Sequence, residues 1–341
     1  MRNKIFTAGL ILLIALPTQF CGCGPQSSVN SSAPEEKNDA LEEQAGRIIK
    51  EALAGSDPRI RANAIEAVSG LPLKQAGIFM PDVQKLLADE FVPVRFVAAV
   101  AVGDMRYVPA KNAVMELLKD KDQNVRLAAA YAVGKLAPGT SVELIGRDLS
   151  SRDLRVRANA AMLLGKIGDK KTIPLLYEAM RDESSDDRVR LNSIEAIARL
   201  GDERIYQKIW ALLISAYADD RVLGVRAMGA LATGQAKDAI ITMLDDDLVE
   251  VRLIAAEQLG NLGDQAGENV VIEALTQGTA GGADRDTKER IETLAALAIG
   301  QIKTRGLKKF LPELLKSESQ FVKIAAAKAV FLIGGDDNIG R

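Results

Sequence analysis

One short line of sequence recurs along this chain of 341 residues. It reads DQNVRLAAAYAVG at 122–134 and DLRVRANAAMLLG at 153–165, a Val-Arg pair followed by small and aliphatic residues and a glycine. Aligning that pair gives nine copies, whose Arg position is held by Arg61, Arg95, Arg126, Arg157, Arg190, Arg226, Arg252, Glu292 and Lys323. In the sixth copy, Leu223 could take the position instead. A period of about 33 residues indicates a stack of repeats, each packed on its neighbours.

Small residues at a fixed place explain why the line is repeated. The residue three positions after the Arg position is small in every copy: Ala64, Ala98, Ala129, Ala160, Ser193, Gly229, Ala255, Ala295 and Ala326. A helix turns once every 3.6 residues, so this residue shares one side with an aliphatic residue four positions later. One copy cannot bury that side alone, and we expect neighbouring helices to stack along it. Each copy also holds a longer amphipathic stretch, such as 172–182, which predicts two helices per repeat.

Aspartates four residues before the Arg position predict where the small-residue helices begin. Asp57 precedes Pro58, a pair typical of an N-cap and a first helical residue. Glycine eight or eleven residues after the Arg position is expected to close the helix. The Asp and Arg side chains could form a charged recognition strip, but we expect a structural ladder in which each Asp caps its own helix and meets the Arg of an adjacent repeat. The predicted ladder comprises Asp57, Arg61, Arg95, Asp122, Arg126, Asp153, Arg157, Asp186, Arg190, Arg226 and Arg252.

The recurring line resembles the short HEAT-like repeats also seen in phycobilisome lyases. The likeness is carried by VRLAAAYAVG at 125–134, VRANAAMLLG at 156–165 and VRLIAAEQLG at 251–260, and it covers about 40–338. The resemblance implies an all-α fold, a right-handed α-solenoid of about nine helix-pair repeats whose second helices line the concave face. Glu292 and Lys323 depart from the pattern, as expected of a capping repeat at the C-terminal end. The family contains scaffolds, adaptors and a few enzymes, so it implies a fold more than an activity.

Composition excludes several kinds of chemistry. There is no histidine, and Lys and Arg number 44 against 46 Asp and Glu, which leaves a net charge of −2. The chain therefore lacks the commonest metal ligand and the basic excess that drives binding to nucleic acid. Its two cysteines lie near the N-terminus, and no phosphate-binding loop or nucleophile motif occurs. We expect no catalytic residue, no metal site and no cofactor.

The N-terminus has the pattern of an export signal. A positive start, MRNK, precedes the apolar segment IFTAGLILLIAL, and FCGC follows at 20–23. Cys23 after the small Gly22 resembles the lipidation site of bacterial lipoproteins, and Cys21 is the alternative. We therefore expect a leader at 1–23, a flexible tether at 24–38 and the solenoid at 39–341. The resemblance implies a lipid anchor in the bacterial cell envelope, at the outer membrane facing the periplasm.

A surface for a protein partner is predicted on the second helices, opposite the packed side. Five residues after the Arg position stand Val100, Tyr131 and Met162 in consecutive copies, an apolar stripe flanked by Glu66 and Glu195. Lys135, Lys166 and Arg199 are predicted to lie alongside. An exposed apolar strip with a charged rim suits a peptide or a partner helix. The alternative is that curvature and packing cover these side chains.

Together these patterns predict a membrane-anchored, non-enzymatic scaffold or adaptor in the cell envelope. Its unidentified protein partner would bind the concave face, and nucleic acid is not expected as a ligand. The alternative, implied by the resemblance, is a lyase-type enzyme or chaperone that acts on a cofactor-bearing protein.

Overall fold

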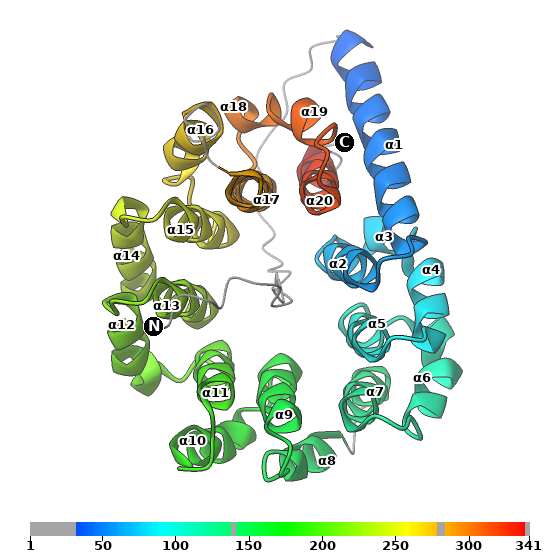
Figure 1. Ribbon diagram of the computed structural model, residues 1–341, viewed down its shortest axis with the longest axis vertical. Helices are drawn as coiled ribbons and strands as arrows, with labels where there is room; N and C mark the ends of the chain where they lie inside the picture. The colour runs from blue at the N-terminus through cyan, green and yellow to red at the C-terminus, as the bar shows by residue number, and fades with distance from the viewer. Residues whose placement is uncertain (1–31, 138–140, 278–283, 338–341) are drawn as a thin grey trace, which may run out of the picture.

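The computed structural model describes residues 32–137, 141–277 and 284–337 of the chain (Figure 1). In these ranges the backbone forms α-helices joined by short turns, some of them single 3₁₀ turns, and no strand. The helices make nine consecutive pairs, as the repeat predicts. The expectation of an all-α solenoid is confirmed.

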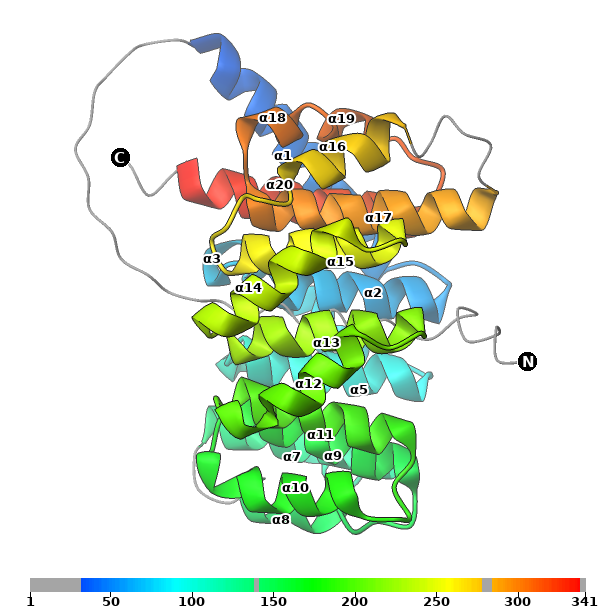
Figure 2. The same ribbon diagram turned by 90° about the vertical axis from the view of Figure 1, so that its left-hand side faces the viewer.

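The helix pairs form two concentric layers (Figure 1). The inner layer consists of α2 (Pro58–Ser69), α5 (Val92–Asp104), α7 (Gln123–Leu136), α9 (Leu154–Ile167), α11 (Asp187–Arg199), α13 (Ala218–Leu231), α15 (Val249–Asn261), α17 (Arg285–Ile302) and α20 (Gln320–Asp337). The outer layer consists of α1 (Ser32–Leu53), α3 (Leu73–Ala76), α4 (Met80–Lys85), α6 (Lys111–Leu117), α8 (Ser141–Asp148), α10 (Ile173–Arg181), α12 (Tyr206–Leu213), α14 (Gly234–Thr242), α16 (Glu268–Thr276), α18 (Arg305–Lys308) and α19 (Leu311–Leu314). Figure 1 shows the inner helices nearly end-on and Figure 2 shows them lengthwise, so they run along the axis that both layers surround.

The two ends of the solenoid meet and close it into a ring (Figure 1). The last inner helix, α20, packs against both α1 and α2, and we call this junction the seam. Phe79 and Phe331 meet there edge to face, with ring centroids 5.6 Å apart. Ala45 and Ile49 of α1 are fully buried. The C-terminal repeat is therefore not the exposed cap that Glu292 and Lys323 predicted.

The contact between repeats confirms the prediction from small residues. Ala64, Ala98, Ala129, Ala160, Ser193, Ala255, Ala295 and Ala326 are all fully buried. Glycine eight residues after the Arg position does not close the helix as expected, because it lies inside the helix against the next inner helix. A Cβ on Gly165 would lie 2.7 Å from the Cα of Ala196, and one on Gly103 would lie 2.7 Å from the Tyr131 ring. These positions need glycine because the inner helices touch backbone to backbone.

The predicted helix ends are largely confirmed. Asp57, Asp122, Asp153 and Asp186 each accept a hydrogen bond from a backbone N–H in the first turn of the following helix. Glycine eleven residues after the Arg position adopts a left-handed conformation just past the helix, as at Gly168, where φ is +87°.

The boundary of the predicted tether differs from the structure. Helix α1 begins at Ser32, so residues 32–38, assigned to the flexible tether at 24–38, are helical. None of the helices in the described ranges is both long enough and apolar enough to cross a membrane.

Candidate functional site

Buried arginines tie each inner helix to the next repeat. Arg61 donates from Nη1 to the carbonyl oxygens of Gly55 (2.8 Å) and Ser56 (3.0 Å), in the loop before its own helix. Its Nε and Nη2 donate to the carboxylate of Asp89 in the next loop, at 2.8 and 2.9 Å. We call this arrangement a clamp, because one side chain joins two successive loops. The paired carboxylate keeps the pKa of Arg61 above its usual value.

Arg95 and Arg221 form further clamps on the same plan, whereas the side-chain hydrogen bonds of Arg157 all go to the next loop. Arg95 pairs with Asp120 (2.8 Å), Arg157 with Asp182 (3.0 Å), and Arg221 with Asp246 (2.7 Å). Arg126, Arg190 and Arg252 instead donate to loop carbonyl oxygens.

The predicted ladder is therefore right for Arg61, Arg95 and Arg157, and wrong in its other arginines and in its acids. The aspartates that cap the helices, Asp57, Asp122, Asp153 and Asp186, do not form the bridges between repeats. The bridging carboxylates belong to Asp89, Asp120, Asp182 and Asp246, which lie at the start of each loop. Only this earlier position brings the carboxylate back to the preceding helix, because the N-cap aspartate is held by its own backbone.

The Arg position of the sixth copy is Arg221, and neither Arg226 nor Leu223 takes it. Arg221 makes the clamp and lies 31 residues from both Arg190 and Arg252. Arg226 therefore stands five residues after the Arg position, among the residues predicted for partner binding. The misleading signal was the Val225-Arg226 pair five residues further along the same helix, since Arg221 itself follows Asp220 and not a valine.

The predicted exposed stripe on the concave face is wrong for two of its three residues. Tyr131 is 1% exposed and Val100 is also buried, whereas Met162 is partly exposed. The Tyr131 ring lies against Gly103 of the preceding helix, and its hydroxyl donates to Asp104 at 2.5 Å. Burial, and then the Asp104 charge, raise the pKa of this phenol. The small residues bring the inner helices so close that these side chains rest on their neighbours, which was the alternative reading.

The predicted rim residues converge on the inner side of the C-terminal turns of α7, α9 and α11. Lys166 Nζ reaches Asp104 at 2.7 Å, past the C-terminal turn of α7. Lys135 Nζ lies 3.5 Å from the carbonyl oxygen of Lys166 and 5.9 Å from the centre of the Tyr131 ring. Arg199 donates to Glu195 at 2.6 Å. Burial lowers the pKa of Lys135, and the Asp104 charge only partly opposes this effect.

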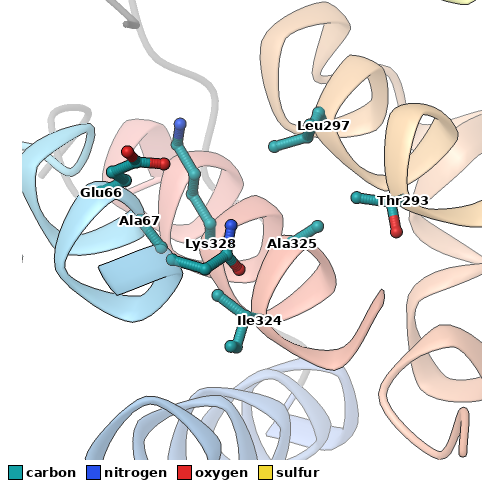
Figure 3. Close-up of a pocket in the computed structure, with 8 residues that line it drawn as sticks. Glu66, Ala67, Thr293, Leu297, Ile324, Ala325 and Lys328 are labelled. Carbon is teal, nitrogen blue, oxygen red and sulfur yellow. The ribbon is translucent and has the colours of Figure 1, made fainter. Parts of the chain in front are cut away.

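Glu66 does not join that group, because it lies at the seam. It lines a small pocket between α2, α17 and α20, where the buried Lys328 extends past its carboxylate (Figure 3). Glu257 of α15 is also buried, and its charge acts on Lys328 although α17 separates the two helices. Burial raises the pKa of Glu257 and lowers that of Lys328; Arg226 and Lys328 oppose the shift at Glu257. This second group of charges therefore lies on the inner side of the ring.

A different apolar surface is exposed where the sixth and seventh repeats meet. It consists of Trp210, Ile214, Tyr217, Ile241 and Leu248, which we call the apolar edge. Ile214 is 68% and Tyr217 58% exposed. The loops that carry Ile214, Tyr217 and Leu248 are joined by Arg221, which bonds Ser215, Asp246 and Asp247. The exposed Asp219, Asp245 and Asp247 lie in or beside the same loops.

The sequence contains a signal for this surface, which was obscured because the sixth copy was aligned on Arg226. Tyr217 and Leu248 occupy the N-cap position, where α2, α7, α9 and α11 have aspartate and α5 has Phe91. Because Arg226 was taken as the sixth Arg position, the N-cap position of that copy was assigned to Val222. Tyr217 was therefore not recognised as the N-cap residue.

The sequence also led to expectations about metal binding and about lipidation. Within the described ranges no group of three or more Cys, Asp or Glu residues is arranged to hold a metal ion. The predicted lipidation site, Cys23 or Cys21, lies outside the described residues.

Comparison with known proteins identifies the repeat. Residues 80–145 and 142–223 match the model for HEAT repeats. Similar solved structures include the complex of CpcE and CpcF of phycocyanin lyase from Nostoc, 19% identical over 75% of this chain and 94% of that one, with a TM-score of 0.42. Human deoxyhypusine hydroxylase is 17% identical over 88% and 99%, with a TM-score of 0.37. Importin beta is 14% identical over 88% and 47%, with a TM-score of 0.36. No curated protein matches the chain.

Proposed function

Because this chain is a HEAT-like repeat protein, we propose that it is a non-enzymatic scaffold that binds a protein partner at the apolar edge. The observation that supports this proposal is the exposure of five large apolar side chains on two adjacent repeats. Tyrosine and tryptophan, both present there, dominate the energetics of many interfaces. Among the described residues, the apolar stripe predicted on the inner face offers no comparable surface, since Val100 and Tyr131 are buried.

The charges around the apolar edge define the partner's chemistry. Exposed carboxylates of Asp219 and Asp245 lie in or beside the loops that carry Tyr217 and Leu248, while the guanidinium of Arg221 is already paired with Asp246 and Asp247. A negative rim attracts a partner that carries positive charge and repels an acidic one. The segment that fits is an amphipathic helix with aliphatic residues on one side and Lys or Arg beside them.

The clamp at Arg221 prepares this surface for binding. It holds the loop at Ser215 and the loop at Asp246 together before any partner arrives. A surface fixed in advance loses less conformational entropy on association. The clamp therefore contributes to affinity without touching the partner.

We also propose that the scaffold is held at a membrane by lipid on Cys23, in the bacterial cell envelope. The proposal is supported by the charged start, the apolar segment and the Gly22-Cys23 pair. Labelling cells with radioactive palmitate checks it: the full chain should be labelled and Cys23→Ser should not. Label retained by Cys23→Ser but lost in Cys21→Ser would move the anchor to Cys21. An unlabelled wild-type chain would refute the anchor.

A designed peptide tests the docking surface. The probe is an amphipathic helix of Leu and Lys, about 18 residues or five turns long, and a Leu and Glu version is the charge control. Fluorescence anisotropy should show saturable binding of the Lys peptide that weakens as salt is raised. The double variant Tyr217→Ala, Leu248→Ala should weaken binding at least about tenfold, the cost of losing one interface anchor.

A matched variant separates this surface from general stickiness. Leu144 and Leu175 are similarly exposed apolar residues on other outer helices, α8 and α10. The double variant Leu144→Ala, Leu175→Ala should bind the Lys peptide like the wild type. Equal loss in both double variants, or equal affinity for the Lys and Glu peptides, would refute the apolar edge as the docking surface.

A further inference from the structure

An arginine on the inner side of α11 has a buried nitrogen without a hydrogen-bond partner. The Arg199 side chain is 9% exposed, and its Nη2 donates to Glu195 at 2.6 Å. Its Nη1 is buried and donates to no atom of the residues that the structure describes. Leaving a buried charged donor unsatisfied costs more than a hydrogen bond ordinarily contributes. The free Nη1 therefore points to a ligand that supplies an acceptor.

Further positive charge gathers beside Arg199. Lys135 and Lys166 occupy the equivalent position on the two preceding inner helices, and the charge of Arg106 acts on Lys135. The charge of Arg199 is felt at the Tyr131 hydroxyl, which places it in the same group. The four cations are matched by only two carboxylates, those of Asp104 and Glu195. The group, which we call the inner cationic cluster, comprises Asp104, Arg106, Tyr131, Lys135, Lys166, Glu195 and Arg199.

The fold itself does not require cations at this position. In the repeat before these three, the same place, nine residues after the Arg position, is held by Asp104, and in the remaining repeats it is held by Gly70, Ala230, Asn261, Gln301 and Leu332. Those repeats stack in the same way with small, neutral or apolar residues there. Three consecutive cations, two of them with side chains 9% exposed, are thus a local addition to the repeat.

We propose that the inner cationic cluster binds a phosphate group, either the free ion or a phosphoester. A dianion matches the surplus of two positive charges, and its oxygens supply the acceptors that Arg199 Nη1 lacks and that Lys135 Nζ has only at 3.5 Å. Guanidinium and ammonium groups are the usual partners of phosphate in proteins. Lys166 stays paired with Asp104 and positions Lys135, whose ammonium otherwise has one long bond of 3.5 Å.

The depressed pKa of Lys135 agrees with this assignment. Burial lowers it, and the neighbouring Arg106 and Lys166 charges add to that effect, while Asp104 opposes it. An anion beside the ammonium restores the charged form, because opposite charges stabilise one another.

Calorimetric titration of the full chain, purified in a mild detergent, tests the proposal at constant ionic strength. The probes are inorganic phosphate, glycerol phosphate and acetate. Saturable binding of inorganic phosphate identifies the free ion, and saturation by glycerol phosphate alone identifies a phosphoester. Arg199→Gln and Lys135→Gln should each weaken binding at least about tenfold, the value of one charge-assisted hydrogen bond. Lys208→Gln, which removes an exposed cation from the outer helix α12, should have no effect.

The two cluster variants protect the test from a folding artefact. Arg199→Gln leaves Glu195 without its partner, whereas Lys135→Gln disturbs the long bond to Lys166 and the contact with the Tyr131 ring. Circular dichroism reports whether each variant folds. If Arg199→Gln does not fold, Lys135→Gln alone decides. Saturation by acetate but not by either phosphate, absence of saturation by any probe, or equal weakening in Lys208→Gln would overturn the proposal.

Discussion

The arc of the ring from α2 to α15 and the arc that runs from α17 through α20 to α1 hold their repeats together differently. In the first arc, buried clamps such as Arg61–Asp89 and Arg221–Asp246 join successive loops. In the second, Glu292 and Lys323 stand at the Arg position, and the ends meet through apolar contacts such as Phe79–Phe331. Repeats built on the same helix-pair plan are thus joined by recurring polar clamps in one arc and by a single apolar junction in the other.

This difference shows which contacts shape the ring and which one closes it. Clamps recur from repeat to repeat, so they set the curvature locally and depend only on adjacent loops. The seam joins residues about 250 or more positions apart in sequence, such as Phe79 and Phe331. Closure of so long a loop costs entropy that only contacts at the seam can offset. Damage to a clamp should therefore stay local, whereas damage to the seam should open the whole ring.

The largest effect is expected from Phe331→Ala at the seam. Removing a buried phenylalanine costs about 3–5 kcal/mol of unfolding free energy, and here it removes the edge contact with Phe79. The ring should open into an arc, so the radius of gyration from small-angle X-ray scattering should rise while helix content stays high. Phe310→Ala, at a partly exposed residue outside the seam, is the control and should leave the radius unchanged. An unchanged radius in Phe331→Ala would show that closure does not depend on this side chain.

A smaller and local effect is expected from breaking a clamp. Arg221→Met leaves the buried carboxylate of Asp246 unpaired, which should cost about 3 kcal/mol of unfolding free energy. Arg126→Met removes hydrogen bonds to carbonyl oxygens only, and should cost about 1 kcal/mol. Urea unfolding measures both, and hydrogen exchange should speed up in the 245–248 loop of Arg221→Met. Equal losses in the two variants would mean that the carboxylate adds nothing to the clamp.

One substitution made in both arcs should change stability in opposite directions. In the first arc, a Cβ on Gly165 meets the Ala196 backbone at 2.7 Å, so Gly165→Ala forces two helices apart and should cost about 1–3 kcal/mol. At the seam, a Cβ on Gly334 meets only the flexible end of Glu42, so Gly334→Ala should gain up to about 1 kcal/mol of helix propensity. Thermal unfolding compares the two. A loss in both would mean that the seam is packed as tightly as the inner junctions.

Periodic features of the fold could be read from the sequence because they recur. Each repeat must bury the same side against the next, so Ala64, Ala160 and Ala326 show the same need at intervals. Closure could not be read in this way, because the contacts of Phe331 and Ile49 at the seam occur once, and Phe331 stands at a position where most copies have glycine. The acids of the clamps were misplaced because two aspartates lie close together before helices such as α7 and α11, and only the earlier one reaches the preceding repeat at Asp120 and Asp182.

The candidate sites were predicted less well than the fold. A helical wheel places Tyr131 opposite the packed side, but it does not show that Gly103 leaves room for the ring to lie flat on the neighbouring helix. The convergence of Lys135, Lys166 and Arg199 was visible as a column, although their burial was not. The apolar edge was missed because Arg226 was taken as the sixth Arg position, which displaced Tyr217 from its column.

The smallest effect concerns the buried charges beside the seam. Burial raises the pKa of Glu257 above its usual value of 4.5, so between the two values the folded chain holds a proton that the unfolded chain has lost. The free energy of unfolding should therefore fall as pH rises through this window, since stability falls wherever the native state binds more protons. Glu257→Gln cannot release that proton, and its stability should fall less over the same range. Lys328 keeps Glu66 as a neighbouring carboxylate in the variant.

Urea unfolding at a series of pH values measures the slope, and Glu273→Gln is the control because it removes an exposed carboxyl from the outer helix α16. The control should keep the slope of the wild type, since an exposed carboxyl loses little hydration on folding. Identical slopes in wild type and Glu257→Gln would mean that Arg226 and Lys328 compensate fully for the burial of Glu257. The inner charges on this side of the ring would then act as a neutral structural network, unlike the inner cationic cluster on the clamped side.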